Sequence, residues 1–179
     1  MKSTQNKYGR VAQLLHWLNA LLILFLIPMG FLMQTVDEGA RLLLYRTHVI
    51  LGVLALGLTL VRLGWHWVDS SPDPPPGLAG RGLLAYKAVH WLLYLALLVL
   101  ALSGIALNVV SGLGDILFAA VSGPIPPDLS DYLSRTVHGL TARVYIGLLI
   151  AHIAGVVSYQ ATEGDVLKRM GLGGWGLSR

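Results

Sequence analysis

Four long apolar stretches are the feature that most restricts what this chain can fold into. Each has the roughly 20 residues that an α-helix needs to cross a bilayer core, and they lie at about 11–33, 47–68, 86–109 and 137–159. Hydrophobic residues make up 55% of the 179 and charged residues only 12%, whereas soluble domains carry about 25% charged residues. The sequence therefore predicts an all-α fold, an integral membrane four-helix bundle built as a single domain over residues 1–179.

The placement of Lys and Arg predicts how this bundle is oriented. With the N-terminus in the cytoplasm, nine of these residues fall on the cytoplasmic side: Lys2, Lys7, Arg10, Arg62, Arg81, Lys87, Lys168, Arg169 and Arg179. The opposite side holds only Arg41, Arg46 and Arg135. The positive-inside rule then places both termini in the cytoplasm, with Arg143 left inside the fourth stretch. The charge of +4 is explained by orientation, and we expect contact with membrane lipid and no nucleic-acid partner.

Four of the six histidines match in predicted depth. His16 and His152 lie a similar distance inside the cytoplasmic end of their stretches, whereas His48 and His138 both open a stretch from the outer side. His138 and His152 are 14 residues apart, so they point to nearly the same side of one helix, with a rise of roughly 21 Å between them. The fourth stretch is therefore expected to contribute one histidine to each of two pairs.

Paired imidazoles inside a bundle suit a metal whose other ligands come from elsewhere. Haem fits this description, because the porphyrin supplies four nitrogens and two axial imidazoles complete the iron. Small residues one turn from the paired histidines leave room for a porphyrin: Ala20, Gly52, Ala142 and Gly155. Cysteine is absent, which excludes thiolate sites and thioether-linked haem. For any single histidine the alternative is a neutral side chain hydrogen-bonded to its neighbours.

The other two histidines lie beside tryptophans near the cytoplasmic face. We expect His66 to belong to an aromatic belt at the membrane interface. Leu93 and Tyr94 occupy the positions one turn from His90, so a porphyrin there would meet bulky side chains. His90 is left with three alternatives: a bond to a haem propionate, proton transfer to a quinone, or a purely structural role.

Three arginines are candidates for binding haem propionates. Arg62 lies near the inner end of the second stretch, and Arg46 and Arg135 lie near the outer ends of their stretches. Arginine forms strong paired hydrogen bonds with carboxylates. The alternative is that these side chains extend to the lipid head groups.

Four segments in order carry a family resemblance: "LLHW", "RTHVILGVLALGLTLVRL", "VHWLLYLALLVLALSG" and "VHGLTARVYIGLLIAH". Together they resemble the prokaryotic cytochrome b561 family over nearly the whole chain. That family is similar to the membrane cytochrome b subunits of formate dehydrogenases and hydrogenases. The resemblance implies a multi-pass protein of the bacterial inner membrane, with two b-type haems between the helices. By motif, the ligands would be His16, His48, His138 and His152.

The resemblance also implies the chemistry. With both axial positions filled by histidine, iron has no open site, so one-electron transfer is expected. Some members resemble superoxide oxidases, which take electrons from periplasmic superoxide and reduce ubiquinone. We expect the same oxidoreductase activity here, because a chain with no fused soluble domain favours a self-contained enzyme. The alternative is an electron carrier between quinol and a periplasmic redox protein. A histidine-lined metal or proton transporter is disfavoured, because the four stretches contain no Asp or Glu.

Overall fold

The fold is taken from a computed structural model that describes residues 2–118, 124–126, 128–164 and 166–173. The described residues form six helices and no strand: α1 (Arg10–Leu32), α2 (Glu38–Val68), α3 (Gly80–Val110), α4 (Leu113–Leu117), α5 (Leu133–Thr162) and α6 (Val166–Arg169). Four of them, α1, α2, α3 and α5, are long and apolar enough to cross a membrane. The predicted all-helical membrane bundle of four spans is confirmed.

Three of the four long helices extend beyond the predicted apolar stretches. The helix α2 begins at Glu38 because the Asp37 side chain caps it by accepting a hydrogen bond from the Ala40 N–H, at 3.0 Å. The helix α5 runs from Leu133 to Thr162. Hydropathy marks only the part of a helix that lies in hydrocarbon, and hydrogen bonding continues the helix into the polar layer on either side.

Left-handed glycines follow two of the long helices. After α3, Gly112 has a φ of 67°, a conformation that residues with a side chain rarely adopt. After α5, Gly164 has a φ of 84° and donates its N–H to the Tyr159 carbonyl at 3.0 Å. Both glycines let the chain leave its helix sharply, toward α4 and α6 respectively.

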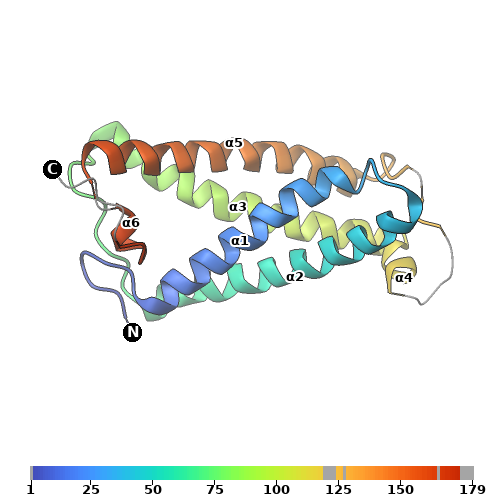
Figure 1. Ribbon diagram of the computed structural model, residues 1–179, viewed down its shortest axis with the longest axis horizontal. Helices are drawn as coiled ribbons and strands as arrows, with labels where there is room; N and C mark the ends of the chain where they lie inside the picture. Colours follow the sequence, from blue (N-terminus) through green and yellow to red (C-terminus); the bar gives the residue numbers. More distant parts are fainter. Residues whose placement is uncertain (1, 119–123, 127, 165, 174–179) are drawn as a thin grey trace.

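The long helices pack as two pairs, α3 against α5 and α1 against α2, and the pairs meet mainly through α2 and α3. Figure 1 shows that α1 begins and α5 ends at the same end of the bundle. We call this end, with the start of α3 and the end of α2, the inner end, after its predicted cytoplasmic side. The opposite end is called the outer end.

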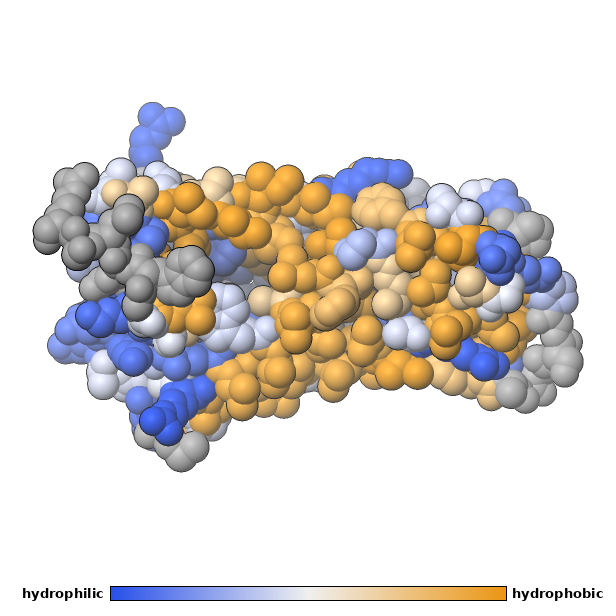
Figure 2. Space-filling model, in the orientation of Figure 1, coloured by the Kyte–Doolittle hydropathy of each residue, from blue (hydrophilic) through white to orange (hydrophobic). Residues whose placement is uncertain are grey.

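The middle of the bundle is covered by apolar side chains that face outward (Figure 2). Examples from each long helix are Leu24, Val61, Leu102 and Ile150, which are all more than half exposed. Hydrophilic residues gather mostly at the two ends (Figure 2). An apolar outer surface of this kind fits lipid as the surrounding solvent.

The short helix α4 packs into the outer end of the bundle. Leu113 and Leu117 are fully buried against α2 and α3, in a cluster that also contains Tyr45 and Leu107. Arg46 of α2 donates a hydrogen bond from Nε to the Leu117 carbonyl. The apolar run 116–121 is too short to span a membrane, and the sequence predicts that it lies on the outer membrane surface. Its first two residues belong to α4, and residues 119–121 lie outside the described part of the chain.

Candidate functional site

At the outer end, the structure brings His48 of α2 and His138 of α5 together. Their ring centroids are 6.3 Å apart, and the ring planes are inclined by 70°. Nδ1 of His138 lies 2.9 Å from the Leu100 carbonyl oxygen, which can only accept a hydrogen bond. In the neutral ring the proton therefore sits on Nδ1, and Nε2 keeps its free lone pair. This tautomer is the one in which Nε2 can bind a metal.

Two glycines on other helices face the outer histidine rings. A Cβ placed on Gly104 of α3 would lie 3.3 Å from Cε1 of His138, and one on Gly30 of α1 would lie 3.4 Å from Cε1 of His48. The α3 backbone at Gly104 therefore approaches His138 more closely than most Cβ atoms would allow, and Gly30 brings α1 close to His48. Ser103, next to Gly104, also has its hydroxyl 3.2 Å from His138 Nδ1.

At the inner end, the structure brings three histidines together. The ring centroids of His16 on α1 and His152 on α5 are 6.4 Å apart. His90 of α3 lies closer to His152, with centroids 5.0 Å apart and planes at 85°. Nδ1 of His90 is 2.6 Å from the Tyr86 carbonyl oxygen, so this ring too carries its proton on Nδ1.

The ring separations distinguish His90 from the two pairs. Two imidazoles on opposite sides of one metal ion, with metal–nitrogen distances of about 2.0–2.1 Å, place their ring centroids about 6.3 Å apart. The predicted pairs, at 6.3 and 6.4 Å, match this spacing. The His90–His152 distance of 5.0 Å is too short for a metal ion between the rings and suits an edge-to-face contact.

The donor set and its surroundings fit haem. The Nδ1 atoms of His16 and His48 are buried with no hydrogen-bond partner among the described residues. Beside His48, a Cβ placed on the half-buried Gly52 would meet no atom within 4 Å, and the same holds for the exposed Gly155 beside His152. No three His, Asp or Glu side chains group closely enough to bind a bare metal ion in the described part of the chain. Two imidazoles per site instead suit a metal that brings its own equatorial ligands.

The three predicted arginines lie at the expected ends of the bundle. Arg62 places its guanidinium 5.2 Å from the centre of the Tyr94 ring, near enough to the inner histidines to interact with them electrostatically. At the outer end, Arg46 is bonded to α4 through the Leu117 carbonyl, and Arg135 donates from Nη2 to the Gln34 side chain at 3.1 Å. Arg62 at the inner end and Arg135 at the outer end are therefore close enough to a histidine site to act on it electrostatically, whereas Arg46 is held by α4.

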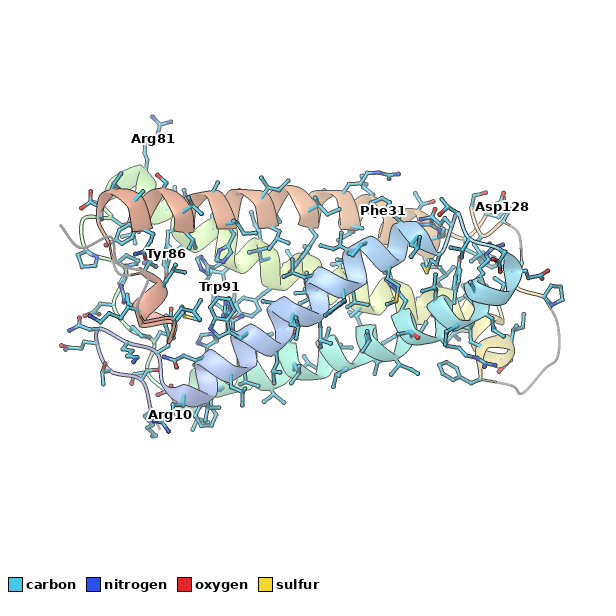
Figure 3. All side chains as sticks on the ribbon, viewed as in Figure 1. Arg10, Phe31, Arg81, Tyr86, Trp91 and Asp128 are labelled. Carbon is cyan, nitrogen blue, oxygen red and sulfur yellow. The ribbon has the colours of Figure 1, made fainter. Side chains whose placement is uncertain are left out.

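His66 takes a different position from the other histidines. Its Nδ1 lies 3.2 Å from the Ser71 hydroxyl and its Nε2 lies 3.2 Å from the Tyr94 hydroxyl. With both nitrogens hydrogen-bonded to protein, His66 has no free atom for a metal. Neighbouring Trp67 is 91% exposed, as expected for an aromatic side chain at the membrane interface. Figure 3 shows Tyr86 and Trp91 of α3 near the inner end, where His66 lies, and Asp128 at the outer end.

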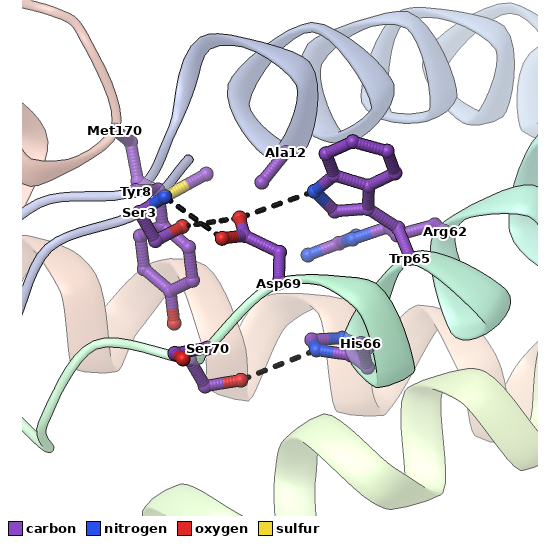
Figure 4. A pocket seen from close by; sticks show the side chains of 10 residues that line it. Ser3, Tyr8, Ala12, Arg62, Trp65, His66, Asp69, Ser70 and Met170 are labelled. Carbon is purple, nitrogen blue, oxygen red and sulfur yellow. Dashed lines mark hydrogen bonds between the residues drawn. The ribbon is translucent and has the colours of Figure 1, made fainter. Parts of the chain in front are cut away.

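Asp69, which directly follows α2, joins the N-terminal segment to the inner end (Figure 4). The Ser3 hydroxyl donates to its carboxylate at 2.7 Å, the Ser3 N–H at 2.9 Å and the Trp65 indole N–H at 3.1 Å. These hydrogen bonds, led by that of the Ser3 hydroxyl, hold the pKa of Asp69 below its ordinary value. This buried carboxylate fixes the chain just ahead of α1, next to Arg62 and His66.

Some residues around the sites were not expected from the sequence. Asn19 donates to the Thr59 hydroxyl at 2.9 Å, and the Thr59 hydroxyl donates to the Ala55 carbonyl at 2.7 Å. This buried chain joins α1 to α2 between the two depths of the histidines. Polar residues inside apolar stretches are the signal that predicts such an interhelical bond. Gly30 and Gly104 carry no comparable signal, because their role depends on how the helices are rotated.

Comparison with known proteins agrees with this arrangement. The family model described as prokaryotic cytochrome b561 matches residues 7–173. The chain is also 24% identical over 176 residues to "Cytochrome b561 homolog 2" of Escherichia coli (strain K12). The alignment covers 94% of this chain and 93% of the relative. No solved structure matches significantly. The four spans and the family match establish a multi-pass protein of the bacterial inner membrane. The chain belongs to the prokaryotic cytochrome b561 family of membrane cytochromes, and membership implies haem b binding and electron transfer.

Proposed function

We propose that this chain binds two b-type haems, one between His16 and His152 and one between His48 and His138. The observation that carries the proposal is the ring separation of 6.4 and 6.3 Å in the two pairs, which suits two axial imidazoles on one iron. Haem held in this way supplies reversible one-electron chemistry with no open coordination position.

The chain's own residues fix the orientation of this ligand set. The Leu100 carbonyl holds the His138 ring in the tautomer that leaves Nε2 free. Gly30 and Gly104 allow α1 and α3 to close over the outer pair. At the inner pair, the guanidinium of Arg62 supplies a positive charge, and we propose that it pairs with a haem propionate. Arg46 and Arg135 are proposed for the same role at the outer end.

We further propose that electrons cross from the outer side to the quinone pool in a superoxide:ubiquinone oxidoreductase reaction. Two superoxide anions each lose one electron and leave as dioxygen. The two electrons, with two protons from water, convert one ubiquinone to ubiquinol. His138 and His152 lie on one helix with a rise of roughly 21 Å between them, so the two sites span much of the bilayer core.

Two cations at the outer end support an anionic substrate. Arg46 lies two residues from His48, and Arg135 lies three residues from His138. Both side chains are half-buried, and the charge of Arg135 acts on His138. Positive charge beside a redox centre raises the association rate of a small anion, and salt weakens the effect.

Stopped-flow mixing of the oxidised, haem-loaded protein with superoxide tests this proposal. We expect haem reduction that slows as ionic strength rises and slows about tenfold when Arg46→Gln and Arg135→Gln are combined. Since Arg46 also bonds the Leu117 carbonyl, the salt dependence of the unmodified protein gives a second readout that leaves α4 intact. Reduction no faster than in a His48→Ala variant would exclude superoxide as donor and leave the carrier between quinol and a periplasmic redox protein.

A further inference from the structure

Arg143 is a charged side chain on the apolar, lipid-facing surface of α5. A hydrophilic patch interrupts the apolar band over this helix (Figure 2). Arg143 is exposed, and its neighbours Leu140 and Val144 are 60% and 53% exposed. The 30 residues of α5 make a helix about 45 Å long, which exceeds the hydrocarbon core by about 15 Å. The Cα of Arg143 therefore lies inside the core, where an unpaired charge is costly.

The guanidinium of Arg143 turns back toward the outer end, as helical side chains lean toward the N-terminus. Its Nη1 donates to the Gly139 carbonyl at 3.4 Å. A second guanidinium, that of Arg135, reaches the same glycine from the other side. A Cβ placed on Gly139 would lie 3.1 Å from Nη1 of Arg135 and 3.9 Å from Nη1 of Arg143. Gly139 thus forms a notch that is flanked by two cations.

These two cations have no carboxylate in direct contact within the described part of the protein. Neither Arg135 nor Arg143 forms an ion pair with a described residue, and the hydrogen bonds of their guanidinium groups go to Gln34 and to the Gly139 carbonyl. Asp128, whose carboxylate feels the charge of Arg135, is exposed and bonded to Ser130. Two like charges that converge on one notch repel each other unless an anion lies between them.

We propose that the notch at Gly139 binds the phosphate group of an anionic phospholipid from the outer leaflet. The notch lies about where α5 leaves the hydrocarbon core, which is the depth of lipid phosphates. Guanidinium groups match phosphate oxygens with paired hydrogen bonds. The surface around the notch faces lipid, whereas the His138 ring faces α3 through Leu100 and Gly104. A lipid phosphate therefore reaches Arg143 and Nη1 of Arg135 from the membrane side, and the other N–H groups of Arg135 stay available for Gln34 and for a haem propionate.

Lipid retention of the haem-loaded protein in nanodiscs tests this site. Discs of phosphatidylcholine with a minor share of phosphatidylglycerol are used, and bound phosphatidylglycerol is counted by native mass spectrometry. We expect Arg143→Gln to retain about fivefold less phosphatidylglycerol than the unmodified protein. Gly139→Leu, which fills the notch and keeps both charges, should lose retention to a similar degree. Arg81→Gln, an exposed cation at the inner end, shows how much a change of net charge does by itself.

Three results would overturn the proposal. The first is equal phosphatidylglycerol retention by Arg143→Gln and the unmodified protein. The second is loss of a haem equivalent in Arg143→Gln, which would assign the arginine to a haem propionate. The third is thermal stabilisation by inorganic phosphate in pure phosphatidylcholine discs equal to that by phosphatidylglycerol, which would identify a soluble anion as the ligand.

Discussion

At the outer end, two histidine rings face each other close to the buried leucines of α4. At the inner end, by contrast, three histidine rings lie close to an arginine and several tyrosines. The outer rings of His48 and His138 are confined by Gly30 and Gly104. Above them, α4 covers the end of the bundle with Leu113 and Leu117. Within the described residues, the polar groups hydrogen-bonded to these rings are the Leu100 carbonyl and the Ser103 hydroxyl.

The inner site is richer in polar groups. His90 contacts His152, Arg62 lies over the Tyr94 ring, and Tyr94 in turn lies 3.2 Å from His66. The difference between the ends indicates that the two sites suit different chemistry. A closed, apolar surrounding suits electron transfer alone, while hydroxyls and imidazoles suit chemistry that also moves protons, such as quinone reduction.

Replacing one proposed haem ligand at a time is the most direct test of the difference between the two ends. We expect His48→Ala or His138→Ala to lose the outer haem and His16→Ala or His152→Ala to lose the inner one, so each variant keeps about half of the haem. Haem per protein, with redox titration of what remains, measures this directly. His90→Ala is the matched variant at the inner end and should keep both haems. Loss of a full equivalent from it would show that His90, and not His16, is the partner of His152.

Much of this arrangement could be predicted from the sequence because depth in a membrane is a one-dimensional quantity. Hydropathy located the four spans, and counting residues from their ends matched His16 with His152 and His48 with His138. The structure brings the two members of each pair together, with ring centroids 6.4 and 6.3 Å apart. Their role as haem ligands stays a prediction.

Contacts that depend on helix rotation could not be predicted in this way. The approach of His90 to His152 and of Gly104 to His138 is set by how α3 turns against α5. Depth also says nothing about hydrogen bonding beyond the spans. The hydrogen bond from Arg135 to Gln34 is one example, and the proposed role of Arg135 at the outer haem stays a prediction.

A smaller substitution tests whether the outer site is confined by the glycine beside His138. A methyl group on Gly104 would lie 3.3 Å from the His138 ring, so either the ring or α3 must shift by a few tenths of an ångström. We expect Gly104→Ala to retain the outer haem about tenfold less well, with the inner haem unchanged. Gly57→Ala is the matched control, because its Cβ would meet no atom within 4 Å. Redox titration separates the two haems; equal loss from both would mean that Gly104 serves general helix packing.

The smallest effect concerns the carboxylates at the two ends. Hydrogen bonds from Ser3 hold the pKa of the buried Asp69 below its ordinary value, and those from Ser130 do the same for the exposed Asp128. A carboxyl whose pKa is lower in the folded protein stabilises it above the unfolded value of about 3.9, and this contribution is lost as the pH falls through the folded value. Asp69→Asn should therefore lower the melting temperature at pH 7 by about 2–4 °C and by less at pH 3. Asp128→Asn should change it less, because its partner is only two residues away in the same loop and water competes for both bonds. Thermal unfolding in detergent at both pH values measures this, and equal shifts for the two variants would show that the buried bond to Ser3 does not hold the N-terminal segment in place.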